Sequence, residues 1–388
     1  MTHIPYARQD INQEDIDILT EALKSDYLTQ GPFVEIFEKT ISDYCGSKFS
    51  LSFNSATSAL HSACLALGVS EGDYVWTSAI TFVASANCAI YCGAKVDFID
   101  IDSVSNNLSI SNLREKLVNA EKKKCLPKVL VIVHFAGQPC DLEAIYKLSQ
   151  EYHFKIIEDA SHAIGAIYKS SHIGSCNFSD ITVFSFHPVK IITTGEGGMI
   201  TTNQEDLFKR LSLIRSHGIN KNKNEIHSHP PEEIWNYEQT HLGFNFRMTD
   251  FQAALGVSQM KRLDEFLKKR HKIAEIYYEQ LIDMPLFLPY KANDSYSAFH
   301  LYVIKLNFKK TKKTQKNIYE AMKNLGIQVN LHYIPVYRHP YYKDLGFKRG
   351  HCPEAENYFL QAMSLPMYNG LNEDMQMKVI ESLRNSFL

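Results

Sequence analysis

Asp159 and Lys190, near the middle of the chain, carry the side chains that amine chemistry on an aldehyde cofactor would use. A lysine amine forms a Schiff base with pyridoxal phosphate, and a carboxylate opposite the ring nitrogen keeps that nitrogen protonated. Each residue also has a simpler interpretation, because an aspartate at a strand end often caps a helix and most loop lysines are solvated charges. The pair is therefore a candidate cofactor site, and the surrounding sequence must decide between these interpretations.

Residues 54–58 (NSATS) are candidates for holding the phosphate of such a cofactor. They follow a short apolar run and open a predicted helix, where unpaired backbone N–H groups and the helix dipole favour an anion. Ordinary helix capping favours the same small, hydroxyl-bearing residues, so the segment could also be a simple helix cap. The segment has neither Walker nor Rossmann glycine spacing, which argues against a nucleoside triphosphatase and against a dehydrogenase.

The segments around these residues alternate between short apolar runs and helical patterns. Continuous apolar strands separated by helices predict a parallel sheet covered on both faces, so the expected fold class is α/β. Ligands of such sheets bind beyond the carboxyl ends of the strands, and Asp159 lies at such an end. The expected strands are 51–53, 74–76, 95–100, 129–133, 155–159, 183–186 and 198–202.

The C-terminal third of the chain has a different pattern. A helical segment from about residue 249 to 279 leads into apolar runs at 300–304 and 327–331, which flank a further helix. These runs predict a smaller α+β domain. The expected division is therefore a large domain of residues 1–255 and a linking helix with a small domain in residues 256–388.

The composition is that of a folded protein with a small-molecule partner. Lys plus Arg number 41 and Asp plus Glu number 43, and the net charge of -2 favours neither nucleic acid nor an anionic membrane. No apolar run is long enough to span a bilayer, and the first residues lack an export signal, so a cytoplasmic location is expected. The 8 cysteines lack disulfide or metal spacing, and no metal site is expected. The polar, histidine-rich stretch 220–240 is expected to be a long exposed loop.

Several strings of the chain resemble, in order and spacing, the sugar aminotransferases of the DegT/DnrJ/EryC1/StrS family. The longest is residues 184–198 (FSFHPVKIITTGEGG), which contains Lys190. The resemblance covers nearly the whole chain. It implies the type I fold of pyridoxal-phosphate-dependent aminotransferases, with a large domain around a mixed, mostly parallel sheet and a smaller α+β C-terminal domain. The other strings are 54–60 (NSATSAL), 80–84 (ITFVA), 158–163 (EDASHA), 215–218 (RSHG) and 243–250 (GFNFRMTD).

The resemblance also implies roles for residues at matching positions. Lys190 would be the catalytic residue that carries pyridoxal 5′-phosphate, with Asp159 at the ring nitrogen and His162 near the phenolic oxygen. Phe82 would stack on the ring, and Asn245 of the partner subunit would reach the phosphate, so that a homodimer shares the site. The other phosphate contacts would be Ala56, Thr57 and Ser185. The nucleotide sugar would contact Tyr6, Asp26, Tyr27, Leu28, Thr29, Asn330, His332 and Tyr333.

Residues 27–32 (YLTQGP), 187–194 (HPVKIITT) and 332–336 (HYIPV) resemble one subgroup of this family. That subgroup transfers the amino group of L-glutamate to C4 of a UDP-linked 2-acetamido-2,6-dideoxy-4-keto-hexose of L-arabino configuration. The implied product is UDP-4-amino-4,6-dideoxy-N-acetyl-β-L-altrosamine, in pseudaminic acid biosynthesis. Aminotransferases for other UDP- or dTDP-linked 4-keto sugars share the cofactor motifs, so these substrates stay open as alternatives.

Two further alternatives differ in their chemistry. Related proteins that dehydrate a sugar at C3 carry histidine at the position of Lys190, so the lysine argues against dehydration. A noncatalytic regulator that binds sugar nucleotides is the other alternative. The presence of Asp159, His162 and Lys190 together argues against it.

Overall fold

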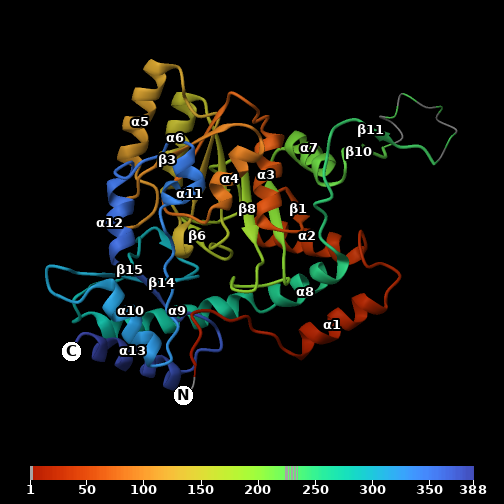
Figure 1. The fold of residues 1–388 in the computed structure, drawn as a ribbon. Helices are drawn as coiled ribbons and strands as arrows, with labels where there is room; N and C mark the ends of the chain where they lie inside the picture. Colours follow the sequence, from red (N-terminus) through yellow and green to blue (C-terminus); the bar gives the residue numbers. More distant parts are fainter. Residues whose placement is uncertain (1–2, 223–225, 227, 229, 231–232, 234) are drawn as a thin grey trace.

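The computed structural model describes residues 3–388 except 223–225, 227, 229, 231–232 and 234. Its centre is a seven-stranded sheet in the order β1-β9-β8-β5-β4-β2-β3 (Figure 1). β9 runs antiparallel to β1 and β8, whereas the other neighbours pair in parallel. The predicted mixed, mostly parallel sheet is confirmed. The strands are β1 (Phe49–Phe53), β2 (Tyr74–Ser78), β3 (Lys95–Ile99), β4 (Val129–Val133), β5 (Lys155–Asp159), β8 (Ile181–Ser185) and β9 (Gly198–Thr202).

Helices cover both faces of this sheet, as its apolar strands require. All residues of β4 are buried, and they alternate between two apolar cores. Val129 and Val131 pack in the core with α3, α4 and α7, whereas Leu130 and Ile132 pack in the core with α2, α5, α6 and α8. The bounds are α2 (Pro32–Cys45), α3 (Ala56–Ala66), α4 (Ala84–Tyr91), α5 (Ile110–Lys123), α6 (Leu142–Tyr152), α7 (Glu205–Arg215) and α8 (Asp250–Met260).

A second, smaller sheet and its helices occupy the lower part of Figure 1. Its antiparallel strands lie in the order β12-β14-β15, and they share a third core with α9, α10 and α13. α1 (Gln13–Lys24) lies to the other side, and Asn12 caps it. The C-terminal elements are α9 (Leu263–Leu281), β12 (Leu286–Phe287), β14 (Tyr302–Leu306), α10 (Gln315–Asn324), α11 (Pro340–Asp344), α12 (Pro353–Gln361), β15 (Ala362–Leu365) and α13 (Glu373–Ser386).

Two elements differ from the sequence-based expectation. The single helix predicted from about 249 to 279 is two helices, because α8 ends at Met260 and α9 begins at Leu263. The run 327–331 does not form a regular strand. Ile327 makes one isolated bridge to Ile4, and Asn330 makes another to Ser364. Ile327 and Val329 are buried whereas Gln328 is exposed, so the pattern marks a partly buried segment but does not distinguish a strand from isolated bridges.

Short strands complete the described part of the chain. β13 (Ser295–Tyr296) pairs with β6 (Ile167–Tyr168), which pairs with β7 (Ser171–His172). β10 (Ile219–Asn220) and β11 (Glu238–Gln239) pair at the two ends of the predicted loop 220–240, and part of that loop lies outside the described residues.

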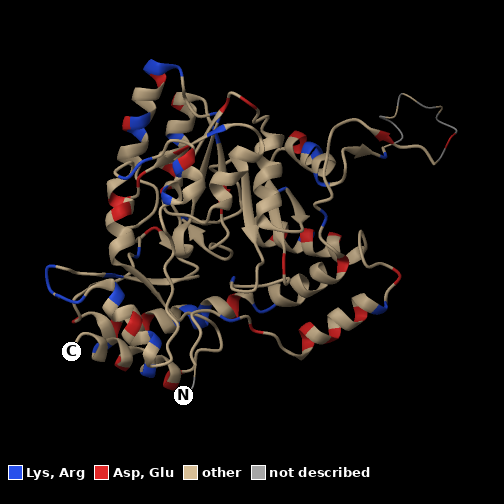
Figure 2. Ribbon diagram, in the orientation of Figure 1, with Lys and Arg blue, Asp and Glu red and all other residues tan. Residues whose placement is uncertain are grey.

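Charged residues of both signs are interspersed over the molecule. Figure 2 shows acidic and basic residues mixed along α5 and α13, with few of either on the central sheet. Within the described residues, no helix is both long enough and apolar enough to cross a membrane.

Glu158 and Asp159 are neighbours on β5, so their side chains point to opposite faces of the sheet. Glu158 is a buried structural carboxylate that accepts three hydrogen bonds. Thr182 Oγ1 donates to it at 3.1 Å, His134 Nε2 lies 2.8 Å away, and Ser179 Oγ also donates. The N–H of Cys140 donates to His134 Nδ1, which places the imidazole proton on Nε2, toward Glu158.

We predict that Glu158→Ala destabilises the fold strongly, because the buried donors His134 and Thr182 and the half-buried Ser179 lose their acceptor. Breaking such a buried network costs about 3–5 kcal/mol. Urea unfolding followed by circular dichroism measures the change. Glu205→Ala is the control, because Glu205 is exposed and pairs with Lys209 one turn further along α7. An unfolding midpoint for Glu158→Ala that falls no further than that of Glu205→Ala contradicts this account of β5.

Candidate active site

Asp159 ends β5 on the sheet face that α3 and α4 cover, and its side chain is buried. Its Oδ2 accepts a hydrogen bond from Ser85 Oγ at 2.6 Å, and its Oδ1 accepts one from the N–H of Ser161 at 3.1 Å. Ser85 in turn lies 2.7 Å from Thr81 Oγ1. These donors hold the carboxylate in one orientation and leave it lone pairs for a ligand.

Ser85 is a site residue that the sequence analysis missed. It comes one residue after the string 80–84, in the first turn of α4, and its buried hydroxyl reaches Asp159 across the sheet face. The available signal was its position directly after the string 80–84, although Phe82 in that string lies before α4 and is exposed, whereas Ser85 is buried. A serine in an alanine-rich helix is usually a packing residue, so its position in the sequence would not have identified Ser85 as a site residue.

Lys190 lies in the loop that joins β8 to β9, and its side chain is half-buried. Ile191 and Ile192 anchor this loop in the core, and Thr193 Oγ1 donates to the carbonyl of Phe186 at 3.0 Å. Burial lowers the pKa of the Lys190 amine to about 8, although the Asp159 carboxylate opposes that shift. About a tenth of this amine is therefore neutral, and so nucleophilic, at pH 7, far more than for an ordinary lysine.

His162 and Tyr333 form a hydrogen-bonded pair beside Lys190. The Tyr333 hydroxyl lies 3.1 Å from His162 Nε2, whereas His162 Nδ1 is buried without a partner among the described residues. Burial and the charge of Lys190 lower the pKa of His162 well below its usual value. His162 is therefore neutral at physiological pH and presents an unused polar atom.

Tyr6, Asn330 and His332 adjoin this pair. His332 Nδ1 lies 2.8 Å from Ser364 Oγ, and its Nε2 lies 3.3 Å from Asn330 Nδ2. The rings of Tyr6 and His332 are 5.6 Å apart. Burial and Lys190 lower the pKa of His332 to about 4. The structure thus brings four of the eight predicted sugar-contacting residues together, next to the amine.

The N-terminus of α3 forms a cradle for an anion. Ser55 caps the helix by accepting the N–H of Ser58, so the N–H groups of Ala56 and Thr57 remain available for a ligand. The chain comes close to this turn at Gly198, where an added Cβ would lie 2.6 Å from the Ser55 carbonyl oxygen. Ser185 pairs with Gly198 across β8 and β9. The cradle fits a phosphate, and Lys190 with Asp159 fits the remainder of a pyridoxal cofactor.

Two other predicted site residues, Phe82 and Asn245, are exposed. Phe82 is 58 % exposed, and its ring lies 6.3 Å from that of Tyr333. Asn245 is exposed, and its carbonyl accepts Asn54 Nδ2 of the same chain at 3.4 Å.

The predicted sugar-contacting residues Asp26, Tyr27, Leu28 and Thr29 are exposed and lie against the start of α8. Thr29 forms an isolated antiparallel β-bridge with Thr249, and the N–H of Asp250 donates to the Leu28 carbonyl at 3.0 Å. Within the described residues of one chain, no hydrogen bond or ring contact joins this segment to Asn330, His332 or Tyr333. The roles given to the segment and to Asn245 therefore stay predictions.

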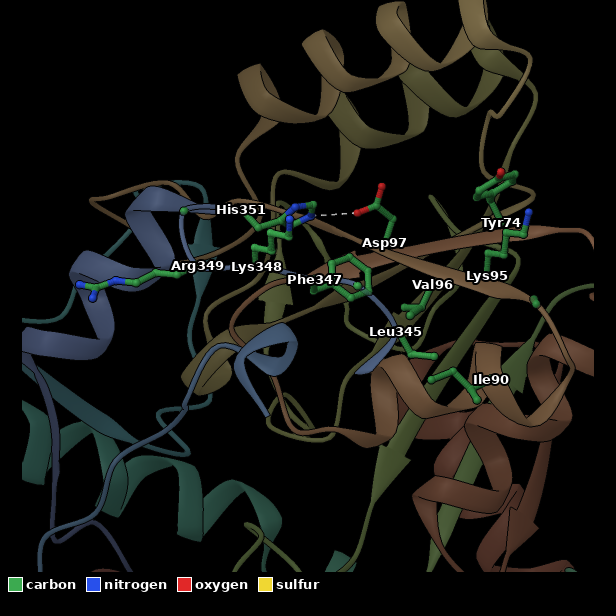
Figure 3. Close-up of a pocket in the computed structure, with 13 residues that line it drawn as sticks. Tyr74, Ile90, Lys95, Val96, Asp97, Leu345, Phe347, Lys348, Arg349 and His351 are labelled. Carbon is green, nitrogen blue, oxygen red and sulfur yellow. Dashed lines mark hydrogen bonds and ion pairs between the residues drawn. The ribbon is translucent and has the colours of Figure 1, made fainter. Parts of the chain in front are cut away.

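A separate pocket of about 810 Å³ lies at the edge strand β3, away from these residues. Figure 3 shows its lining, in which His351 faces Asp97, Lys348 lies beside His351 and the Arg349 side chain extends away from the other labelled residues. It contains none of the predicted site residues. Lys190, in contrast, interacts electrostatically with Asp159, His162 and His332, which are all predicted site residues.

Comparison with known proteins identifies the class of this site. Residues 9–384 match the DegT/DnrJ/EryC1/StrS aminotransferase family. The UDP-4-amino-4,6-dideoxy-N-acetyl-beta-L-altrosamine transaminase of Campylobacter jejuni is 37% identical over 392 residues, 99% of each chain. The GDP-perosamine synthase of Caulobacter vibrioides is 33% identical over 391 residues, 99% of this chain and 98% of that protein.

A solved structure has the same fold. Helicobacter pylori PseC, an aminotransferase involved in the biosynthesis of pseudoaminic acid, matches with a TM-score of 0.89 and 31% identity, over 100% of this chain and 99% of that one. The expected aminotransferase fold and the resemblance to the family are confirmed. The chain belongs to the DegT/DnrJ/EryC1/StrS aminotransferase family and is a pyridoxal-phosphate-dependent aminotransferase of sugar nucleotides.

Proposed function

We propose that the protein transfers an amino group from L-glutamate to C4 of a UDP-linked 2-acetamido-2,6-dideoxy-4-keto-hexose of L-arabino configuration. The product is UDP-4-amino-4,6-dideoxy-N-acetyl-β-L-altrosamine. The observation that carries the amine transfer is the half-buried Lys190, whose lowered pKa leaves its amine reactive opposite Asp159. Similarity to the Campylobacter transaminase and to PseC supports this sugar. The alternative is another nucleotide-linked 4-keto sugar, which the likeness to a perosamine synthase favours.

Lys190 would act as the acid and base of the reaction. Its amine removes a proton from the α-carbon of glutamate in the first half-reaction and delivers one to C4 of the sugar in the second. Bound pyridoxal phosphate supplies the electron sink that stabilises negative charge on the substrate carbon. Asp159 holds the proton on the ring nitrogen, and the hydrogen bonds from Ser85 and Ser161 keep its carboxylate in place.

The neighbouring residues would bind and orient. His162 stays neutral beside Lys190 and, with the Tyr333 hydroxyl, offers hydrogen bonds at the phenolic side of the ring. We propose the phosphate contacts as Ala56, Thr57, Ser185 and the partner's Asn245, with Phe82 against the ring. We propose the sugar-nucleotide contacts as Tyr6, Asp26, Tyr27, Leu28, Thr29, Asn330, His332 and Tyr333.

The proposal includes a homodimer, a cytoplasmic location and a division of the chain between residues 255 and 256. The third core, which α9 shares with the small sheet, supports the division. All 8 cysteines are free thiols, as is usual in a reducing compartment. The exposed segment 26–29 supports a shared site, because within one chain it lies against α8 and away from the sugar-contacting cluster.

We predict that Lys190→Ala lowers multiple-turnover amination by at least about 10³-fold, because the proton carrier at the substrate carbon is lost. Product formation from glutamate and the keto sugar, followed by mass spectrometry, measures the loss. Lys147→Ala removes an exposed lysine of α6 and serves as the control with unchanged turnover. Sustained turnover by Lys190→Ala rules out this role.

The rate at which the apo-protein captures pyridoxal phosphate should rise with pH around a midpoint near 8, because only the neutral Lys190 amine reacts. An ordinary lysine would give a midpoint near 10.4. Asp159→Asn should move the midpoint to lower pH, because the carboxylate raises the pKa of Lys190. Stopped-flow absorbance measures the rate, and Nα-acetyl-lysine corrects for titration of the cofactor. A midpoint above 10, or an upward shift in Asp159→Asn, contradicts the assignment.

The substrate is tested by offering glutamate with the L-arabino and D-xylo UDP-linked 4-keto sugars and a GDP-linked 4-keto-6-deoxy sugar, each in a separate reaction. We expect amination of the L-arabino compound, with a mass gain that matches the amino sugar. Exclusive use of either other compound refutes the proposed substrate and leaves the aminotransferase assignment intact.

A further inference from the structure

Ser364, on β15, contacts two of the predicted sugar-contacting residues but has no role of its own in the proposed reaction. Its hydroxyl oxygen lies 2.8 Å from Nδ1 of His332. Its backbone pairs with that of Asn330 in an isolated antiparallel bridge. The Ser364 N–H donates to the Asn330 carbonyl at 2.7 Å, and the Asn330 N–H donates to the Ser364 carbonyl at 3.2 Å. One residue of the small sheet therefore holds both Asn330 and His332.

These three residues differ in burial. Ser364 is fully buried and His332 is 8 % exposed, whereas Asn330 is half-buried. The backbone of His332 has a separate anchor, because the Tyr358 hydroxyl donates to the His332 carbonyl. The Ser364 hydroxyl is thus the contact at the buried end of the imidazole, and Asn330 is the end that a ligand can reach.

The hydrogen bonds of Asn330 determine which ring nitrogen of His332 carries the proton. The N–H of Leu331 can only donate, and it lies 2.8 Å from Asn330 Oδ1, so the amide oxygen is the acceptor there. The amide nitrogen of Asn330 therefore faces His332 Nε2, at 3.3 Å, and donates to it. Burial and the charge of Lys190 lower the pKa of His332 to about 4, so the ring is neutral at pH 7. A neutral imidazole that accepts at Nε2 carries its proton on Nδ1, which donates to the Ser364 hydroxyl oxygen.

We propose that Ser364 is a positioning residue for sugar-nucleotide binding, which fixes the tautomer of His332 and, through His332, the orientation of the Asn330 amide. Both ring nitrogens of His332 have partners within the chain, so its polar effect on a ligand passes through Asn330. This role rests on the proposed function, because it requires that Asn330 contacts the sugar nucleotide. The tautomer of His332 does not depend on which sugar the enzyme aminates.

Removal of the Ser364 hydroxyl would act on the side chains and leave the backbone held. The two main-chain hydrogen bonds between Ser364 and Asn330 do not involve the hydroxyl, and Tyr358 still donates to the His332 carbonyl. Without the hydroxyl, a proton on Nδ1 would be buried with no acceptor, which favours the proton on Nε2. Nε2–H would then face the N–H of the Asn330 amide, two donors together, so the amide would turn away from its present orientation.

Nitrogen-15 NMR of the holoenzyme, labelled at the ring nitrogens of histidine, tests the tautomer without any assumption about the sugar. The signals of His332 are identified by their loss in His332→Gln. We expect a proton on Nδ1 alone at pH 7, and its transfer to Nε2 in Ser364→Ala. Asn330→Asp should also place a proton on Nε2, because a carboxylate can only accept. A proton on Nε2 in the unaltered enzyme overturns the proposal.

Kinetics of the two half-reactions separate positioning of the sugar from a general structural role. The substrate is the L-arabino, D-xylo or GDP-linked keto sugar, whichever the wild-type enzyme aminates. Ser364→Ala should raise KM for the keto sugar about tenfold, because uniform binding energy of one oriented amide is lost. We expect kcat and the rate of the half-reaction with glutamate to stay unchanged.

Ser386→Ala is the matched control, because its hydroxyl is also buried and donates to the Leu383 carbonyl at 2.6 Å within α13. We expect KM of this variant to equal that of the wild type. A KM in Ser364→Ala no higher than in Ser386→Ala, or an equal loss in the glutamate half-reaction, overturns the role of Ser364. Failure of the wild type to aminate the L-arabino sugar refutes the proposed substrate and leaves the tautomer measurement as the test of Ser364.

Discussion

The site depends on placing an amine in a partly desolvated position opposite one carboxylate. Burial lowers the pKa of Lys190, and Asp159 limits that shift, so the amine titrates at about pH 8. The sheet creates this opposition, because the carboxyl end of β5 presents Asp159 while the loop after β8 carries Lys190. The same positive charge helps to keep His162 and His332 neutral. A further cation would be costly at this edge of the sheet, and the neighbouring groups are accordingly neutral hydrogen-bonding side chains.

The sequence predicted the parts of this arrangement that follow from burial and chain order. Strands buried on both faces appear as continuous apolar runs, so β4 and β5 were visible and Asp159 could be placed at a strand end. The hydroxyl-rich turn before α3 could be identified as an anion cradle, because it follows an apolar run and opens a helix. The cluster of Tyr6, Asn330, His332 and Tyr333 was reached only through resemblance to a family, because its members are far apart in sequence and meet through tertiary packing.

Other features have no local signature. The contact of Ser85 with Asp159 depends on how α4 packs against the sheet, because Ser85 resembles an ordinary small core residue within its own helix. The break between α8 and α9 falls within a continuous helical pattern, so periodicity alone could not place it. Ile327 is as buried as a strand residue, yet its backbone pairs with Ile4 in one isolated bridge. In each case the structure of the segment depends on a residue that is distant in sequence. The sequence of the segment alone therefore does not predict it.

Reduction of the holoenzyme with borohydride, followed by peptide mapping, tests the central claim most directly. The reagent would fix pyridoxal phosphate to the amine that carries it, and mass spectrometry would identify that residue without any assumption about the sugar. The account predicts a single phosphopyridoxyl label on Lys190, in the segment 184–198. A label on another lysine, with Lys190 unmodified, would contradict it.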